Sequence, residues 1–92
     1  MKDIARSVRV TGRVQGVAYR VWARSQAVAL GLRGWIRNRG DGSILALIVG
    51  PEDAVKAMIA AMSEGPGAAR VTDVWVEDAD PGDLSGGFEI IL

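Results

Sequence analysis

The sequence contains neither histidine nor cysteine, and these two absences exclude several kinds of site. Without histidine there is no imidazole to act as a base or as a metal ligand, and without cysteine there is no thiolate and no disulfide. Serine–histidine and cysteine–histidine nucleophile systems are therefore excluded, as are zinc sites built from thiolates or imidazoles. Only carboxylate and carbonyl oxygens remain as ligands for a hard cation.

The chain also has no excess of charge and no long apolar run. Eleven basic residues balance eleven acidic ones, so no long-range field would draw the protein to nucleic acid or to an anionic membrane. The N-terminal residues MKDIARSVRV include no stretch of signal-peptide length, and no later segment approaches a membrane span. We therefore expect a cytoplasmic protein with no membrane or nucleic-acid partner, in which any anion binding is local.

The length and the hydrophobic content of the chain suit one small folded domain. Of the 92 residues, 49% are hydrophobic, which is enough for a single domain with one core, residues 1–92. Val8, Val10 and Val14 alternate with polar residues, as in a strand with one buried face. From Tyr19 the period changes to that of a helix, and Gly31 supplies its C-terminal stop. The expected buried side of this helix consists of Tyr19, Trp22, Ala23, Gln26, Ala27 and Leu30.

The second half of the sequence alternates strands with one more helix. Residues 33–38 and 43–49 read as two antiparallel strands joined by a hairpin turn at 39–42, whose Asp-Gly pair is typical of such turns. Proline and acidic residues at 51–53 predict the start of a second helix. Its expected buried side consists of Val55, Met58, Ile59 and Met62. Residues 69–77 contain a fourth strand, and a polar link at 78–87 leads to a short strand at 88–92.

The order β-α-β-β-α-β predicts an α+β fold of the ferredoxin-like, split βαβ type, in which two helices cover one face of a mostly antiparallel sheet. The short last strand is expected to be added at an edge. The third strand is apolar on both sides, so Leu45, Leu47 and Val49 are expected to form a patch on the outer face of the sheet. With Trp75 this patch would suit a dimer contact, or neighbouring side chains would partly cover it in a monomer.

The connection between the first strand and the first helix is a candidate anion site. Gly16 permits a backbone conformation closed to other residues, so several N–H groups can point inward at the helix N-terminus. Arg20 would lie in the first helical turn, where the helix dipole disfavours a positive side chain by about 0.3–1 kcal/mol. A bound dianion held between the helix end and the guanidinium would explain this arginine. The alternative is a solvent-facing arginine at a tight turn.

Asn38 is the second candidate, at the end of the predicted second strand. Its carboxamide can accept a hydrogen bond from a water and hold that water in line with a phosphorus atom. Asparagine is also a favoured turn residue that caps its own backbone, and this is the alternative interpretation.

Two segments resemble the signatures of one family. Residues 12–20 read GRVQGVAYR, which resembles the signature G-x-V-Q-G-V-x-[FY]-R of acylphosphatases, and residues 31–38 read GLRGWIRN, similar to their second signature G-x-x-G-W-V-R-N. The likeness continues through Asp41-Gly42-Ser43, Gly50-Pro51 and Gly65-Pro66 to Phe88-Glu89-Ile90, so it covers nearly the whole chain.

The resemblance implies an enzyme that hydrolyses the carboxyl–phosphate bond of small acyl phosphates to a carboxylate and inorganic phosphate, with no cofactor and no metal. It implies that Asn38 orients the attacking water and that Arg20 and the loop amides bind the phosphate. The phosphate-binding residues would be Gln15, Gly16, Val17, Ala18, Tyr19 and Arg20. The chain departs from the family at Arg39-Gly40, where an added positive charge near the site would favour more anionic acyl phosphates.

Two other functions are compatible with this fold. An RNA-binding module needs exposed aromatic residues on the central strands and a basic surface, whereas the third strand has no aromatic residue and the net charge is zero. A maturation or carrier domain within a larger machine would use the same pocket. A free-standing enzyme, monomeric or dimeric, is the expectation that the sequence favours.

Overall fold

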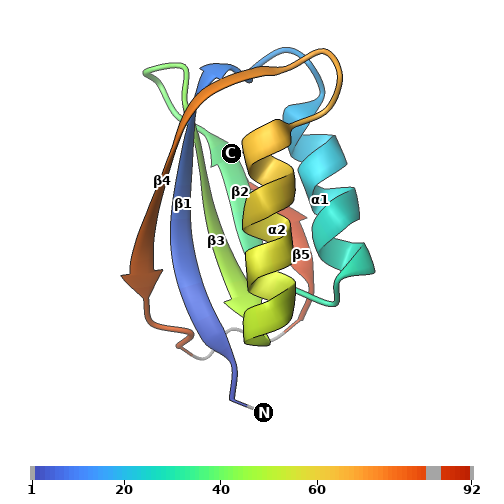
Figure 1. Ribbon diagram of the computed structural model, residues 1–92, viewed down its shortest axis with the longest axis vertical. Helices are drawn as coiled ribbons and strands as arrows, with labels where there is room; N and C mark the ends of the chain where they lie inside the picture. Colours follow the sequence, from blue (N-terminus) through green and yellow to red (C-terminus); the bar gives the residue numbers. More distant parts are fainter. Residues whose placement is uncertain (1, 83–85, 92) are drawn as a thin grey trace.

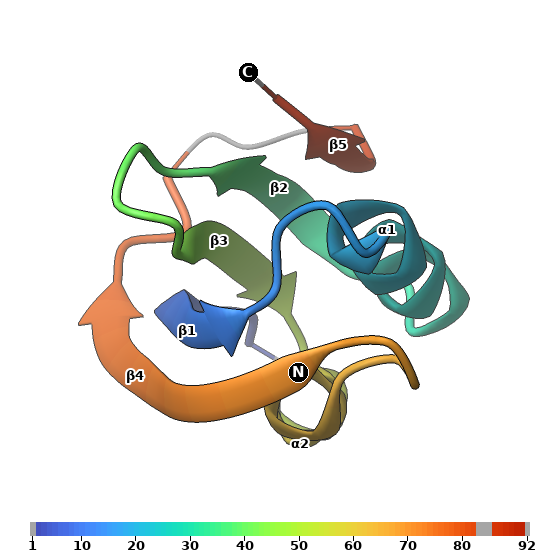
Figure 2. The ribbon, with the colours of Figure 1, turned by 90° about the horizontal axis from the view of Figure 1, so that it is seen from above.

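The computed structural model describes residues 2–82 and 86–91. Within these residues five strands and two helices follow one another in the predicted order. They are β1 (Ile4–Arg13), α1 (Tyr19–Ala29), β2 (Arg33–Asn38), β3 (Ile44–Gly50), α2 (Glu52–Glu64), β4 (Arg70–Ala79) and β5 (Phe88–Ile90). Both helices lie on the same face of one sheet, and the other face is open (Figures 1 and 2).

The sheet has the strand order β4-β1-β3-β2-β5 (Figure 2). β1 pairs antiparallel with β3 and with β4, and β2 pairs antiparallel with β3. β5 pairs parallel with β2 at the edge, which confirms the predicted fold class and the added edge strand. The predicted last strand at 88–92 ends at Ile90 in the structure, and Leu92 lies outside the described residues.

The core lies between the helices and the inner face of the sheet. The alternation seen in the sequence places Val8 and Val10 inward from β1, opposite Ala46 and Ile44 of β3. The predicted buried side of each helix is confirmed for its central residues. The fully buried residues are Tyr19, Ala23 and Ala27 on α1 and Val55, Met58 and Met62 on α2. The remaining members of the predicted faces are half-buried at the margin of the core: Trp22, Gln26, Leu30 and Ile59.

The ends of the helices follow the predicted signals. α1 ends at Ala29, and Gly31 follows with its N–H bonded to the carbonyl of Val28. α2 begins directly after Pro51 and carries two acidic residues in its first turn, where they complement the helix dipole. No helix in the described part of the chain has the length and apolar character needed to cross a membrane.

The outer face of the sheet differs from the prediction at one position. Leu45 and Leu47 are half-buried and Trp75 is 54% exposed, but Val49 is fully buried. Val49 lies between Ala5 of β1 and Arg33 of β2. The alternation in the sequence predicts only that Val49 points to the outer face. Its burial depends on the two flanking strands, which the sequence pattern does not reveal. The predicted patch of three residues is therefore smaller, while its role in a dimer stays a prediction.

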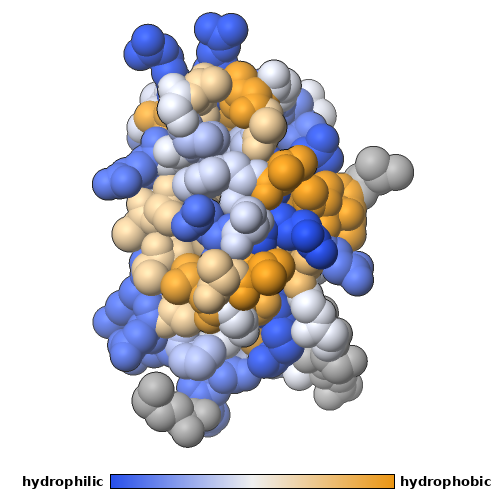
Figure 3. Space-filling model, turned by 90° about the vertical axis from the view of Figure 1, so that its right-hand side faces the viewer, coloured by the Kyte–Doolittle hydropathy of each residue, from blue (hydrophilic) through white to orange (hydrophobic). Residues whose placement is uncertain are grey.

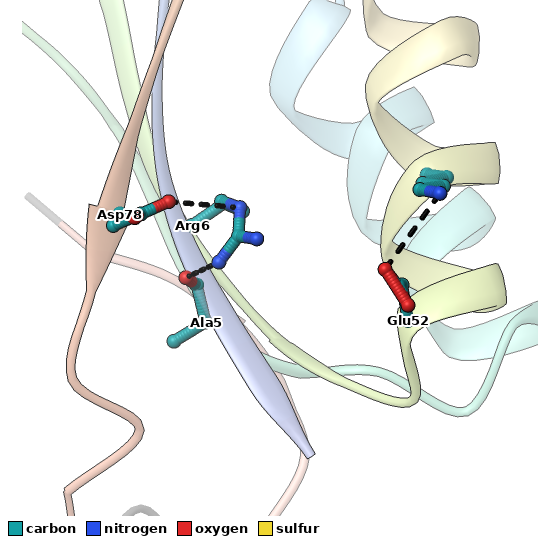
Figure 4. A network of polar contacts seen from close by, with 5 residues as sticks. Ala5, Arg6, Glu52 and Asp78 are labelled. Atoms are coloured by element: carbon teal, nitrogen blue, oxygen red, sulfur yellow. Dashed lines mark hydrogen bonds and ion pairs between the residues drawn. The ribbon is translucent and has the colours of Figure 1, made fainter. Parts of the chain in front are cut away.

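Ion pairs add modest links at the surface (Figure 4). Arg6 joins β1 to β4 because its Nε lies 3.4 Å from Asp78 Oδ1, while its Nη1 donates to the carbonyl of Ala5 at 2.8 Å. Glu52 and Lys56 form an i,i+4 pair at 3.6 Å on α2. Exposed pairs of this kind contribute about 0–1 kcal/mol each, so the buried core dominates stability.

Gly34 in β2 is the position where the sheet depends most clearly on glycine. Its φ of 133° is unfavourable for other residues, and a Cβ added there would collide with the carbonyl oxygen of Leu47 on β3. We expect Gly34→Ala to lower the free energy of unfolding by about 3 kcal/mol or more, measured by urea denaturation. Gly67→Ala is the matched control, because its added Cβ would meet nothing within 4 Å, and it should change stability by less than about 1 kcal/mol. Equal stabilities of the two variants would contradict this account.

Candidate active site

Residues 14–18 form a tight loop between β1 and α1, here called the β1–α1 loop. Gly16 has a φ of 75°, and Ala18 adopts a left-handed conformation with φ 61° and ψ 24°. A left-handed alanine is uncommon and costs free energy, about 1 kcal/mol or more. Two such residues curl the backbone, and a curled backbone can direct successive N–H groups into one concavity.

The N–H groups of this loop and of the first helical turn are available to a ligand. Ala18 is the N-cap of α1, offers no side-chain acceptor, and is followed by no acidic residue in the first turn. The first hydrogen bond of the helix runs from the N–H of Trp22 to the carbonyl of Ala18 at 3.1 Å. Within residues 2–82 and 86–91, nothing accepts a hydrogen bond from the N–H groups of residues 16–20. These donors, with the positive end of the helix dipole, suit an anion.

A small hollow of about 100 Å³ lies against this loop, here called the loop hollow. It is lined by Val14, Gln15, Gly16, Ala18, Tyr19, Arg20, Val21 and Asn38. The structure thus brings Asn38 to the same place as five of the six residues expected to bind phosphate. The sixth, Val17, packs its side chain against the core and does not line the hollow.

Asn38, the last residue of β2, has a buried side-chain oxygen. Its Oδ1 is buried and forms no hydrogen bond to any residue that the structure describes. The alternative, that Asn38 caps the hairpin turn, is not what the structure shows, because Asp41 Oδ1 accepts the N–H of Ser43 at 2.9 Å instead. An unsatisfied buried oxygen costs about 1–3 kcal/mol, so it is typical of a position that a ligand or a water completes.

Gln15 holds the β1–α1 loop against the hairpin that carries Asn38. Its Nε2 donates to the carbonyls of Arg39 and Ser43, both at 2.8 Å. The hairpin itself is stiffened by Asp41, whose pKa is held below its usual value chiefly by a hydrogen bond from the Ser43 side chain. Loop and hairpin lie at the same end of the molecule (Figure 1). From the sequence we expected only the backbone amide of Gln15 to bind phosphate. The sequence did not reveal that the Gln15 side chain positions the loop against the hairpin.

The two arginines near this end of the sheet have different surroundings. Arg20 is half-buried and lines the loop hollow, so it is not the fully solvent-facing arginine of the alternative interpretation. No carboxylate among the described residues pairs with it. Arg39 instead lines a separate hollow on the open face of the sheet, together with Arg9 and Trp75. The charged side chain of Arg39 is therefore not among the groups that line the loop hollow.

Comparison with known proteins identifies the family to which this chain is related. The acylphosphatase family model matches residues 6–90. The chain belongs to the acylphosphatase family. It is 48% identical over 93 residues to an acylphosphatase of Mesorhizobium japonicum, covering 99% of both chains, and 51% identical over 83 residues to one of Rhizobium meliloti, covering 90% of this chain and 87% of that one. The crystal structure of acylphosphatase from Bacillus subtilis superposes with a TM-score of 0.92 at 32% identity, covering 97% of this chain and 99% of that chain.

Within this acylphosphatase fold, Tyr19 contributes to the loop hollow while its side chain serves the core. The ring is buried, packs edge-to-face on Trp22 at 5.3 Å, and donates its hydroxyl to the carbonyl of Met62 at 2.7 Å. Burial raises the pKa of the Tyr19 hydroxyl, so this group remains a neutral donor. The bond to Met62 anchors the start of α1 to α2 and steadies the loop before it.

Proposed function

We propose that the protein hydrolyses the carboxyl–phosphate bond of small acyl phosphates, with Asn38 orienting the attacking water and the β1–α1 loop and Arg20 binding the phosphate. The observation that supports this assignment is the buried Oδ1 of Asn38, which has no hydrogen-bond partner among the described residues and lies beside loop N–H groups that also have none there. Family membership supports the reaction class.

The phosphate would be bound by local groups alone. The chain has no net charge, so attraction cannot come from the protein as a whole. The amides of Gln15 to Arg20 provide fixed donors at a helix N-terminus, and the guanidinium of Arg20 adds a planar fork that matches two phosphate oxygens. Because these donors are already positioned, they can stabilise charge on the equatorial oxygens during the transfer without reorganising.

The water would be held by Asn38. Its Oδ1 accepts a hydrogen bond from the water, whose oxygen attacks phosphorus as the bond from phosphorus to the acyl oxygen breaks. The bonding pair leaves on the carboxylate, and a proton of the water passes to a phosphate oxygen of the substrate. A carboxylate is a good leaving group that needs little protonation, so a site without histidine suffices.

The experiment that tests this reaction is hydrolysis of benzoyl phosphate by the purified protein, with and without inorganic phosphate. We expect turnover, competitive inhibition by phosphate because the product occupies the same loop, and unchanged activity after exhaustive chelation. A protein that does not hydrolyse benzoyl phosphate, or that recovers activity only with a divalent ion, would contradict the proposal.

The remaining expectations belong to the same proposal. The substrate is a small acyl phosphate and the product is inorganic phosphate, with no nucleic acid or membrane as partner. The protein is expected to act as one domain, as a monomer or a dimer, in the cytoplasm. Gel filtration of the purified protein measures the oligomeric state directly.

A further inference from the structure

A larger hollow runs along the outer side of α1, here called the helix–edge hollow. It is open, has a volume of about 700 Å³, and is lined by Val21, Arg24, Ser25, Val28, Glu89 and Ile90. Three of these are hydrophobic residues with high exposure: Val21 at 65%, Val28 at 54% and Ile90 at 36%. Figure 3 shows the side of the molecule that carries α1 and β5, where hydrophobic side chains gather beside charged ones.

The helix–edge hollow adjoins the loop hollow at one residue. Val21, in the first turn of α1, lines both of them. Val28 lies seven residues further on the same side of the helix, about 10 Å along its axis. The larger hollow therefore starts beside the Arg20 loop and extends toward the C-terminal end of α1.

The two elements that line the helix–edge hollow are joined by a hydrogen bond. Arg24 Nε donates to the carbonyl of Phe88 at 3.0 Å, which ties α1 to β5. Arg24 and Glu89 contribute opposite charges to the lining, so the lining has no net charge. Single exposed hydrophobic residues need no explanation, but here three of them line one hollow, and one of the three, Val21, also lines the loop hollow.

We infer that the helix–edge hollow binds the acyl group of the substrate. This inference rests on the proposed function: with the phosphoryl group in the loop hollow, the acyl group would pass over Val21 and lie against Val28 and Ile90. The substrate class that fits is an acyl phosphate with an uncharged, apolar aliphatic or aromatic acyl group. Arg39, which the sequence suggested as a reason to prefer anionic acyl groups, lines the hollow on the other face of the sheet.

The first test measures binding without turnover. Methylphosphonate and hexylphosphonate present the same phosphonate group, and only hexylphosphonate reaches into the helix–edge hollow. A fully buried methylene strengthens binding about fourfold, and about half of that effect is expected in an open hollow. Titration calorimetry should therefore show hexylphosphonate binding about tenfold more tightly or better. Equal affinities would overturn the inference.

The second test changes the hollow itself. Val28→Ser should lower the ratio of kcat/KM for decanoyl phosphate, whose acyl chain is long enough to reach Val28 from Val21, to kcat/KM for acetyl phosphate about threefold to fivefold. Because the effect is a ratio measured on one preparation, a partial loss of folded protein cancels. Val76→Ser is the matched control, since Val76 is a 43% exposed valine on β4 outside this hollow, and it should leave the ratio unchanged.

The outcomes separate the two proposals. If neither acyl phosphate is hydrolysed, the proposed function fails, and the phosphonate titration still decides the acyl site. If both are hydrolysed but Val28→Ser and Val76→Ser give the same ratio as the unmodified protein, the proposed function stands and the acyl site is overturned.

Discussion

Asn38→Ala is expected to lower kcat for benzoyl phosphate by about two to four orders of magnitude while the inhibition constant of inorganic phosphate changes less than about threefold. The reason is that the Asn38 oxygen would contact the water and not the phosphate, so its loss removes orientation of the nucleophile and spares ground-state binding. The loop amides and Arg20 remain in place in this variant. Steady-state kinetics with phosphate as competitive inhibitor measures both quantities.

The control for Asn38→Ala is Asp41→Asn in the same hairpin. Asp41 is exposed and accepts hydrogen bonds from Ser43, and the carboxamide has nearly the same shape, so kcat should stay within about threefold of the unmodified value. Turnover of benzoyl phosphate by the Asn38→Ala protein at the unmodified rate would show that Asn38 does not orient the water.

The Arg20→Ala variant is expected to lose phosphate binding as well as turnover. In the proposed site the Arg20 guanidinium would donate two charge-assisted hydrogen bonds to the phosphate, so its removal should lower kcat/KM about a thousandfold, with a rise in KM and a matching loss of inhibition by phosphate. Arg20→Lys should recover only part of this loss, since lysine restores the charge without the planar fork. The comparison of KM, kcat and inhibition constant across the three proteins measures these effects.

Arg13→Ala serves as the control for Arg20→Ala because it removes the same charge from an exposed arginine at the end of β1, which does not line the loop hollow. Its kcat/KM should change less than about threefold, as for a screened charge that does not touch the ligand. Equal losses of phosphate inhibition in the two variants would mean that Arg20 acts through general charge and not by contact.

Much of the fold could be predicted because its signals are local. Alternation at Val8 and Val10 depends only on the two-residue period of a strand, and the faces of α1 and α2 depend only on the helical period. The Asp41-Gly42 turn and the start of α2 after Pro51 are likewise decided by neighbouring residues. The ends of strands are less predictable from the sequence: β1 begins at Ile4, before the clear alternation, because its pairing with β3 extends to Ile4 and its pairing with β4 extends to Ala5.

The sequence by itself determined the order of the elements, the family signatures and the types of residue available for chemistry. Only the tertiary structure decided which of them meet: Asn38 beside the β1–α1 loop, the Gln15 side chain on the hairpin, Val49 covered on the outer face, and Val21 shared by two hollows. The physical reason is that local patterns depend on a few adjacent residues, whereas these contacts depend on how distant strands pair and how a helix packs against an edge strand.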